Sequence, residues 1–506
     1  MKYIHIILFL ILISFGGFAQ KRNVVWCFGH QAGLKFINSQ IDTFTSAVVS
    51  RGSCASIADK NGMLQFYVAD DTSALLASTI KGAKVYNKNN IIMTGGDSLV
   101  GEGWYNELLI IPFPNDSNQC YVICADVVNT AIFGLYYSIV NIQLNSGLGG
   151  VTQKNIQLQS FPQVDCLNAV KHGNGRDWWL FFRRWDGIGN TPNNEFHSYL
   201  ITPNGITNYT IQNVGSLITS GGGNIAFTKD GKKIVYTNWE GLIEKYDFDR
   251  CTGIISNPVT IKQIPPTGFN FYFGSALSPS GNVLYVSYQV STTSYLFQYD
   301  LTAPNIAASV DTLWTQSSPI YGAGHLRRAP DYKIYFTCAY VPLTAPMYPY
   351  ADSIYNMYNM NLSVINTPDS LGAACNFLPY SFYLGGKRTY WGLPNNPDYD
   401  LGPDSGSVCD TIISASSWQP AINKNQLHLF YHSAWQKLFV NAQNIKGKNA
   451  MLKIFDMNGR IVFSSLSKTN PPYLTEDVDC TLFSKGMYIV SLITERENLV
   501  GKFIKE

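Results

Sequence analysis

The chain repeats one pattern of apolar and polar positions. An alternating run leads through a tight polar turn into a run of β-branched and aromatic residues, which is typical of a β-hairpin. Most turns contain Asn-Gly, Asp-Gly or Ser-Gly, which tolerate the backbone angles of tight turns. The second turn residues are spaced 57, 56, 56, 50, 51 and 54 residues apart. The seven copies lie at 54–68, 108–124, 168–182, 225–237, 275–287, 325–337 and 379–393.

This spacing predicts the fold class. A period of roughly 50 residues has room for four short strands, the content of one propeller blade. We therefore expect an all-β protein with a seven-bladed β-propeller over residues 22–400. Val24–Phe28 and Leu34–Ile37 precede the first copy, and we expect them to join the last blade and close the ring. Two stacked β-sandwiches are the alternative.

The N-terminus has the pattern of an export signal. Lys2 begins a short cationic region, Ile4–Phe15 is mostly apolar, and Gly17-Phe-Ala19 is a small-x-small cleavage site. The apolar run is shorter than a membrane-spanning helix requires. Residues 1–19 are therefore predicted to be a signal peptide, with no transmembrane segment in the mature chain.

The C-terminus reads as a linker followed by a small β-domain. Residues 401–424 are rich in Pro, Gly and Ser, as linkers often are. Residues 425–506 contain two predicted hairpins that form a small β-sandwich. Asn458-Gly459 provides the turn of the first hairpin, and Gly486 opens the second pair of strands.

This tail resembles the type A C-terminal sorting domain of proteins exported by the type IX secretion system of Bacteroidota. The motifs are IFDMNGRIV at 454–462, LFSKGMYIVSL at 482–492 and GKFIKE at 501–506. The resemblance implies passage through the periplasm and the outer membrane, a secreted or cell-surface location, and the secretion machinery as a partner. The Pro-Asn-Pro opening usual in that family is absent from 427–438. The motif residues of interest are Asn458, Gly459, Gly486, Tyr488 and Lys502.

The repeats carry a second resemblance. TKDGKKIVYT at 228–237 and SPSGNVLYVS at 278–287 resemble the WD40-like repeats of Tol-type propellers. The opening at 26–36, together with 52–67, resembles large Bacteroidota surface proteins that carry a propeller before a sorting domain. Both resemblances agree with the fold that the spacing predicts.

Composition narrows the function classes. Charged residues make up 14% of the chain, and the net charge of +2 has no basic block, so nucleic acid is not an expected partner. Ten cysteines suit an oxidising compartment, but the sequence leaves their pairing open. Only Cys480 lies in the tail, so at least one thiol stays free if bridges remain within domains.

No common catalytic signature is present, so no catalytic residue, metal or cofactor is predicted. Asp398, Asp400 and Asp404 offer oxygen atoms but lack the spacing of a calcium loop, and a turn or linker is the simpler interpretation. Propeller geometry places the starts of the inner strands at a central channel, where a polar mouth can hold a small ligand. The candidate ligand-binding residues are Trp104, Tyr105, Asn106, Asn168, Asn224, His325 and Arg327.

These residues have an alternative role, which is to bond channel waters and exposed backbone. The first functional hypothesis is a non-enzymatic interaction or adhesion module with a surface glycan or protein as ligand. A carbohydrate-binding propeller is the alternative, because aromatic side chains such as Trp178 and Trp179 are suited to stacking on sugar rings. The structural interpretation of the same residues is that they fill the space between neighbouring blades. A glycan-active enzyme is a further alternative, which requires carboxylates such as Glu102 and Glu107 at the channel mouth.

Overall fold

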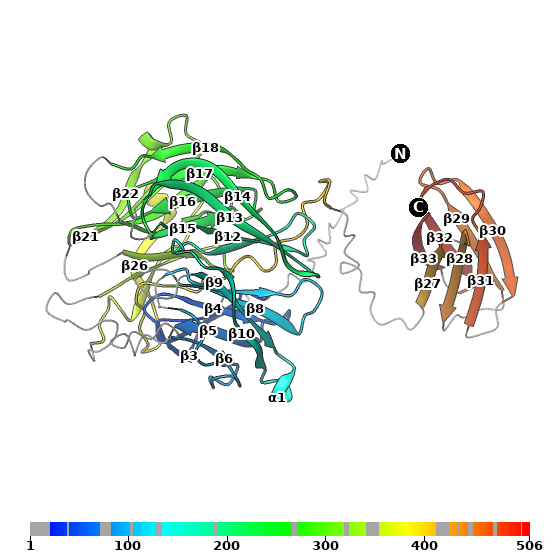
Figure 1. Cartoon of the computed structure of the whole chain (residues 1–506), viewed down its shortest axis with the longest axis horizontal. Coiled ribbons are helices and arrows are strands. Elements are labelled where there is room, and N and C mark those ends of the chain that lie inside the picture. Colours follow the sequence, from blue (N-terminus) through cyan, green and yellow to red (C-terminus); the bar gives the residue numbers. More distant parts are fainter. Residues whose placement is uncertain are drawn as a thin grey trace, which may run out of the picture. The chain divides into compact units, whose positions relative to one another are not determined.

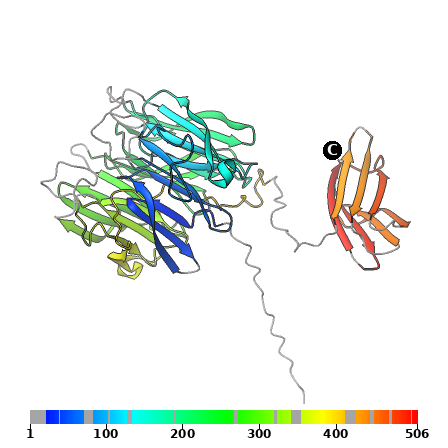
Figure 2. The same cartoon turned by 90° about the horizontal axis from the view of Figure 1, so that it is seen from below.

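The chain divides into two units, residues 1–413 and residues 414–506 (Figures 1 and 2). The predicted signal peptide lies outside the described residues, in which no helix has the length and apolar character to cross a membrane. The computed structural model describes residues 21–37, 40–70, 82–101, 105–126, 134–186, 191–265, 271–317, 323–340, 354–410, 426–433, 435–443, 449–468, 473–496 and 498–505.

Seven β-sheets follow one another along the described part of the first unit, each built from consecutive antiparallel strands. The first three sheets comprise β1 (Val25–Phe28), β2 (His30–Ile37) and β3 (Gln40–Val49); β4 (Cys54–Ala58), β5 (Leu64–Asp70) and β6 (Ala83–Asn87); and β7 (Leu108–Pro112), β8 (Gln119–Asp126), β9 (Gly134–Asn141) and β10 (Gly150–Gln159). The next two comprise β11 (Asn168–Lys171), β12 (Trp178–Arg183), β13 (Asn193–Thr202) and β14 (Gly205–Ile218); and β15 (Gly223–Phe227), β16 (Lys233–Asn238), β17 (Ile243–Phe248) and β18 (Ile255–Lys262). The last two comprise β19 (Phe271–Leu277), β20 (Val283–Val290), β21 (Thr293–Asp300) and β22 (Asp311–Ser317); and β23 (Ala323–Arg328), β24 (Ile334–Cys338), β25 (Asn361–Ile365) and β26 (Phe377–Tyr383). The helical elements are short: α1 (Leu144–Gly147), η3 (Ala307–Ser309) and η4 (Gly372–Cys375).

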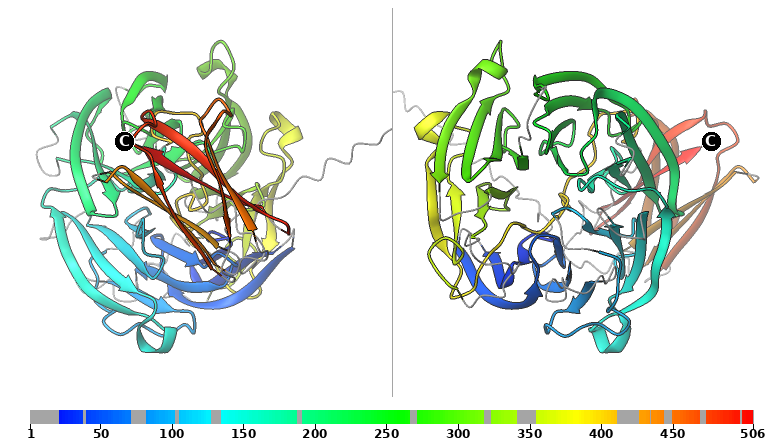
Figure 3. Two further views of the ribbon diagram at one scale, coloured as in Figure 1. Left: turned by 90° about the vertical axis from the view of Figure 1, so that its right-hand side faces the viewer. Right: turned by 60° about the vertical axis from the view of Figure 1, so that its left-hand side comes forward.

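The sheets are arranged around a common centre (Figure 3). The first strand of each sheet lies against the first strand of the next: β1 against β4, then β7, β11, β15, β19 and β23 in turn. The ring is completed by side-chain packing, because Trp26 and Phe36 of the first sheet contact Tyr335 of the last at ring-centroid distances of 5.9 and 5.8 Å. The first unit is therefore a β-propeller, with the first strand of each sheet innermost.

The prediction of a seventh inner hairpin at 379–393 is wrong. Phe377–Tyr383 is not an inner strand but β26, the outermost strand of the sheet that starts with β23. The prediction that the N-terminal strands would join the last blade is also wrong, because β1 and β2 pair with each other, Val25 opposite Lys35, and form with β3 a sheet separate from that of β23–β26. Gly29 permits this hairpin because its φ of +60° suits the tight turn between them.

Large aromatic side chains fill the space between neighbouring sheets. Trp178 and Trp179 point to opposite faces of β12, as adjacent residues of a strand do. Trp178 packs with the sheet of β7–β10 and is 1% exposed, whereas Trp179 packs with the sheet of β15–β18 and is 5% exposed. Each buried aromatic side chain contributes about 2–3 kcal/mol of hydrophobic stabilisation. These two residues therefore belong to the core rather than to a sugar-binding surface.

Residues 388–404, here called the central segment, cross the middle of the ring without forming a strand (Figure 3). Asn395 is its main junction. The Asn395 Nδ2 donates to the carbonyl oxygens of Leu108 at 3.2 Å and Leu167 at 2.8 Å, and Arg327 Nη2 donates to its Oδ1 at 2.9 Å. One side chain thus joins three sheets at their inner strands. Other bonds of the segment run from His30 N to Arg388 O, Trp391 N to Arg51 O, His325 N to Trp391 O, Asn395 N to Cys54 O, and Ser56 N to Asn396 Oδ1.

The chain stays on the propeller beyond the point where a linker was predicted. Arg250 Nη2 donates to Gly402 O at 2.6 Å, and Lys232 forms an ion pair with Asp404 at 2.8 Å. A disulfide then joins Cys409 to Cys251, in the turn between β17 and β18. Residues 401–410 therefore belong to the propeller unit, and the rest of the predicted linker, 411–424, lies outside the described residues.

The second unit is a sandwich of two sheets around its own core. One sheet contains β27 (Gln426–His432), β28 (Lys437–Gln443) and β31 (Tyr473–Asp479). The other contains β29 (Asn449–Phe455), β30 (Ile461–Lys468), β32 (Gly486–Thr494) and β33 (Asn498–Lys505). Leu438, Val440, Leu452, Ile454, Val490 and Leu492 are buried between the sheets.

We predict that Asn395→Ala destabilises the propeller. The substitution leaves two buried carbonyl oxygens and Arg327 without their partner, so the free energy of unfolding should fall by about 2–4 kcal/mol. Urea denaturation followed by tryptophan fluorescence measures this change. Asn204→Ala, at an exposed turn position, is the matched control and should shift stability by less than about 0.5 kcal/mol. Equal stability of the two variants would contradict the role assigned to Asn395.

We also predict that the Cys251–Cys409 disulfide stabilises the propeller. The bond closes a loop across 158 residues of sequence. Its loss should lower the free energy of unfolding by about 2–4 kcal/mol, through the entropy that the unfolded chain regains. Cys409→Ser should reproduce the effect of a reducing agent and abolish any further response to it. Cys375→Ser, which removes a buried free thiol, should retain that response.

Candidate binding site at the centre of the propeller

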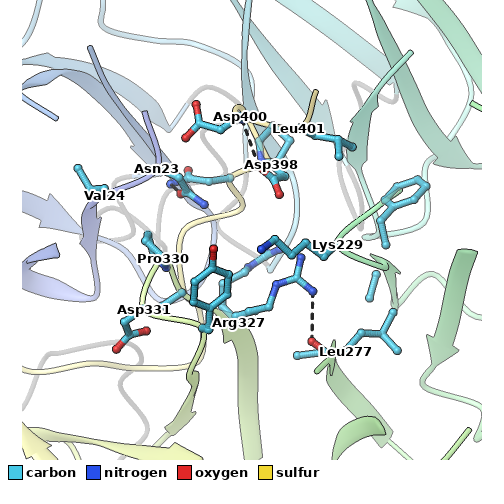
Figure 4. Close-up of a pocket in the computed structure, with 18 of the residues that line it drawn as sticks. Asn23, Val24, Lys229, Leu277, Arg327, Pro330, Asp331, Asp398, Asp400 and Leu401 are labelled. Atoms are coloured by element: carbon cyan, nitrogen blue, oxygen red, sulfur yellow. Dashed lines mark hydrogen bonds between the residues drawn. The ribbon is translucent and has the colours of Figure 1, made fainter. Parts of the chain in front are cut away.

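A cavity of about 660 Å³ opens at the end of the ring where the inner strands run into their turns (Figure 4). Its walls come from the ends of β11, β15, β19 and β23, the turns after β15 and β23, and the central segment. This volume lies within the usual range for small-molecule sites. The cavity is therefore the candidate binding site of the propeller.

The cavity lining carries both signs of charge. Arg327 is already bonded to Asn395, and Asp331 Oδ2 accepts a hydrogen bond from the Tyr335 hydroxyl at 2.8 Å. The hydrogen bonds of Arg327 and Asp331 therefore stabilise the wall of the cavity. The charged residues of the lining are Lys21, Lys229, Arg327, Arg328, Asp331, Asp398 and Asp400.

The remaining groups come from different parts of the chain. Arg328, at the end of β23, donates from Nη1 to Leu277 O at 3.3 Å, and desolvation lowers the pKa of its guanidinium. Lys229 Nζ lies 4.0 Å from the ring centroid of Tyr332, across two hairpin turns. Desolvation and the nearby Asp398 carboxylate raise the pKa of Asp400 to about 7. A shared cavity thus brings cations of two hairpins together with carboxylates of the central segment (Figure 4).

Two of the residues predicted from the sequence, Tyr105 and His325, lie in a buried aromatic cluster. The Tyr105 ring centroid is 5.6 Å from those of Phe273, His325 and Trp391, and 6.1 Å from that of Trp239. Tyr105 and His325 are almost fully buried. Burial lowers the pKa of His325, so its imidazole is neutral at pH 7. Aromatic side chains packed in this way fill the centre of the propeller rather than leave the open channel mouth that the sequence predicted.

Asp165 fixes the backbone that carries this cluster. Its carboxylate is 2% exposed and accepts hydrogen bonds from the backbone N–H groups of Tyr105 at 2.8 Å and Asn106 at 2.5 Å. Burial raises the pKa of Asp165 to about 7. Asn106 Nδ2 donates to Asn224 Oδ1 at 3.4 Å, and Asn224 Nδ2 donates to Ser275 Oγ at 2.7 Å. The Asn224 amide thus joins the neighbouring inner strands β15 and β19, and the Asn106 amide joins the residues before β7 to β15.

The predicted site residues thus fall into two groups. Tyr105, Asn106, Asn224 and His325 lie in the buried centre, whereas Asn168 and Arg327 line the cavity. Asn168 also donates from Nδ2 to Ile225 O at 2.6 Å. The remaining predicted residue, Trp104, lies outside the described residues.

Sequence reasoning missed several of the residues that give the cavity its charge and its aromatic surface. Lys229 and Tyr332 sit at hairpin ends, and the repeat identified those hairpins but not their convergence. Asp398 and Asp400 were interpreted as turn or linker residues, yet both line the cavity. Throughout the described ranges, no group of three or more His, Cys, Asp or Glu side chains is placed to hold a metal ion.

The predicted motif residues of the tail occupy a separate hairpin system. Asn458 and Gly459 form the turn between β29 and β30, where Gly459 has a φ of +76°. Gly486 begins β32, and the Tyr488 hydroxyl donates to Ser484 O at 2.7 Å. Lys502 is exposed on β33. Tyr488 is thus a core residue, whereas Asn458, Gly459 and Lys502 are available at the surface.

The raised pKa of Asp165 predicts a pH-dependent stability. The folded propeller favours the protonated carboxyl, so the contribution is full at acidic pH and is lost as the pH rises through about 7. The free energy of unfolding should fall by roughly 1–3 kcal/mol between pH 5 and pH 8. Denaturant titrations of wild type and Asp165→Asn across this range isolate the effect, because Asp400 titrates in both proteins. Identical pH profiles would contradict the assignment.

Comparisons with solved structures give only weak likenesses. A Bacteroides fragilis protein named for a proposed 6-phosphogluconolactonase activity has 10% identity and a TM-score of 0.43, covering 74% of this chain and 98% of that chain. TolB from Acinetobacter baumannii has 12% identity and a TM-score of 0.32, covering 66% of each chain. The Cps50 (Swd1) β-propeller domain of Myceliophteria thermophila has 10% identity and a TM-score of 0.35, covering 63% and 94%. The propeller architecture therefore rests on the sheet arrangement of this chain itself.

The tail gives a clearer result. No curated protein matches the chain by sequence. Residues 434–506, however, match the family described as a secretion system C-terminal sorting domain. This range covers most of the two-sheet sandwich and the three motifs noted in the sequence. The C-terminal unit is therefore a sorting domain of the type IX secretion system, and the chain is a β-propeller protein exported to the cell surface or the extracellular space.

Proposed function

We propose that the exported propeller is a non-enzymatic binding module that takes its partner at the cavity end of the ring. The observation that carries this proposal is the central segment. It occupies the middle of the propeller, and the cavity of about 660 Å³ opens where that segment meets the hairpin turns. A fixed framework with one concave, charged end is suited to binding, because little ordering is needed when a partner arrives.

The polar groups of the ring centre support a framework role. Asn168 and Asn224 donate to groups on the neighbouring inner strands, and Asp165 accepts from the backbone N–H groups just before β7. Glu107, one of the two carboxylates required for an enzyme, is fully buried and is not among the residues that line the cavity. Glu102, the other, lies outside the described residues. Binding through the cavity needs neither carboxylate.

Carbohydrate binding is the second candidate. Tyr332 is 52% exposed and shares the cavity with Asp398 and Asp400. An accessible aromatic ring beside carboxylates is a common arrangement for sugar hydroxyls and sugar CH groups. This candidate specifies the ligand of the same binding module rather than a different activity.

Binding to the cell surface tests the proposed function. Fluorescently labelled full-length protein should bind saturably to intact cells of a strain that lacks the export machinery. The double variant Lys229→Glu/Arg328→Glu should weaken binding at least about tenfold, because it reverses the cavity cations. Lys262→Glu, an exposed lysine on the outer strand β18, is the matched control and should bind like wild type. Absence of saturable binding, or equal binding by both variants, would contradict the proposal.

We predict that export of the protein depends on its C-terminal sorting domain. A chain that ends after residue 424 lacks the sorting domain, so its amount at the cell surface and in the medium should fall at least about tenfold. The truncated protein should accumulate in the periplasm with the Cys251–Cys409 disulfide formed. Cell fractionation with immunoblotting measures both quantities. Lys437→Ala, which removes an exposed ion pair with Asp477, is the control and should be exported normally. Export of the truncated chain at normal yield would refute the dependence.

A further inference from the structure

Tyr332 occupies a backbone position that the equivalent hairpins give to glycine. Its φ is +65°, in the left-handed region that L-residues with a side chain rarely adopt. The matching turn residues are Gly62 at +84°, Gly175 at +73°, Gly231 at +72° and Gly281 at +76°. The turn after β23 therefore carries backbone strain that four turns of the same type avoid.

Packing does not account for this tyrosine. The side chain is 52% exposed, so it gains little from burial. Its ring instead lies beneath Lys229 Nζ at 4.0 Å, on the lining of the cavity. Backbone strain that local packing does not explain is often retained for function. Tyr332 thus supplies a flat, accessible surface at the cavity.

The cavity also contains a cationic and an anionic wall. Arg327 and Asp331 are bonded to neighbouring parts of the wall. Lys229 and Arg328 are the cations beside Tyr332. Within the described part of the chain, Arg328 donates one hydrogen bond, from Nη1 to Leu277 O, so its other guanidinium N–H groups are available to a ligand.

The anionic wall comes from the central segment (Figure 4). Asp398 Oδ1 accepts a hydrogen bond from the backbone N–H of Asp400 at 3.1 Å, which holds the two residues in one turn. The pKa of Asp400, raised to about 7, leaves this carboxyl partly protonated at neutral pH. A partly protonated carboxyl both donates to and accepts from hydroxyl groups, as a polyol ligand requires.

We propose that the cavity binds a pyranose sugar that carries a carboxylate. The sugar ring stacks on the face of Tyr332 that Lys229 does not cover, its carboxylate reaches past the edge of that ring to Lys229 and Arg328, and its hydroxyl groups bond to Asp398 and Asp400. Guanidinium and ammonium groups form strong charge-assisted bonds with carboxylates, which gives the acidic sugar its advantage over a neutral one. This inference rests on the proposed binding function and specifies its ligand.

Calorimetric titration of the full-length protein tests the ligand class. D-glucuronic acid and D-galacturonic acid are the probes, and D-glucose and D-galactose are their neutral counterparts. At least one acidic sugar should bind about tenfold or more tightly than its neutral counterpart. Equal affinity for the two, or no binding of either acid at about 10 mM, would overturn the inference. Saturable cell binding in the same preparation would still leave the proposed function standing.

Variants at two positions separate binding from folding. Tyr332→Gly should lower affinity for the acidic sugar about tenfold while leaving the melting temperature equal or higher, since glycine relieves the strain. Tyr332→Phe should bind within about threefold of wild type, because the ring is retained. Arg328→Gln should remove the preference for the acidic sugar, whereas Lys262→Gln should preserve it. Wild-type affinity in Tyr332→Gly, or a full acidic preference in Arg328→Gln, would refute the assigned contacts.

Discussion

Closure of the ring is the constraint on which the rest of the structure depends. The seven described sheets are separate, so strand pairing alone does not hold the first sheet to the last. Two interactions do this work: Trp26 and Phe36 pack on Tyr335, and the central segment bonds to the inner strands. The bonds of the central segment are needed because the inner strands converge on the axis of the ring, where their backbone N–H and C=O groups must find hydrogen-bond partners. Asn395 and its neighbours supply those partners from within the chain.

The way the ring closes also determines where the cavity lies. A centre occupied by the central segment and the Tyr105 cluster has no room for an open channel along the whole axis. The cavity forms instead where the segment leaves the centre and the hairpin turns stand apart. Its chemistry follows from this position, since the carboxylates of Asp398 and Asp400 come from the segment and the cations of Lys229 and Arg328 come from the turns.

Local sequence signals predicted much of the fold and little of the site. Six of the seven predicted hairpins exist because Gly, Asn and Asp at turn positions act through neighbouring residues alone. The module at 379–393 has the same local pattern but bonds instead to His30, Arg51 and His325, all distant in sequence. The cavity gathers residues from Lys21 to Gly402, so no short window contains it. Tyr332 lies at a turn position where most copies have Gly, but only the structure shows that it adopts a positive φ there.

The sorting signal and the propeller are separate units, and the disulfide lies near the end of the propeller unit. The sorting domain has a core of its own, separate from that of the propeller. Cys409 is bonded to Cys251 at the end of the propeller unit, after the central segment has crossed the ring. A pull on the chain downstream of Cys409 is therefore resisted at this bond rather than at Asn395. Because the bond forms only under oxidising conditions, it secures ring closure once the chain has left the cytoplasm.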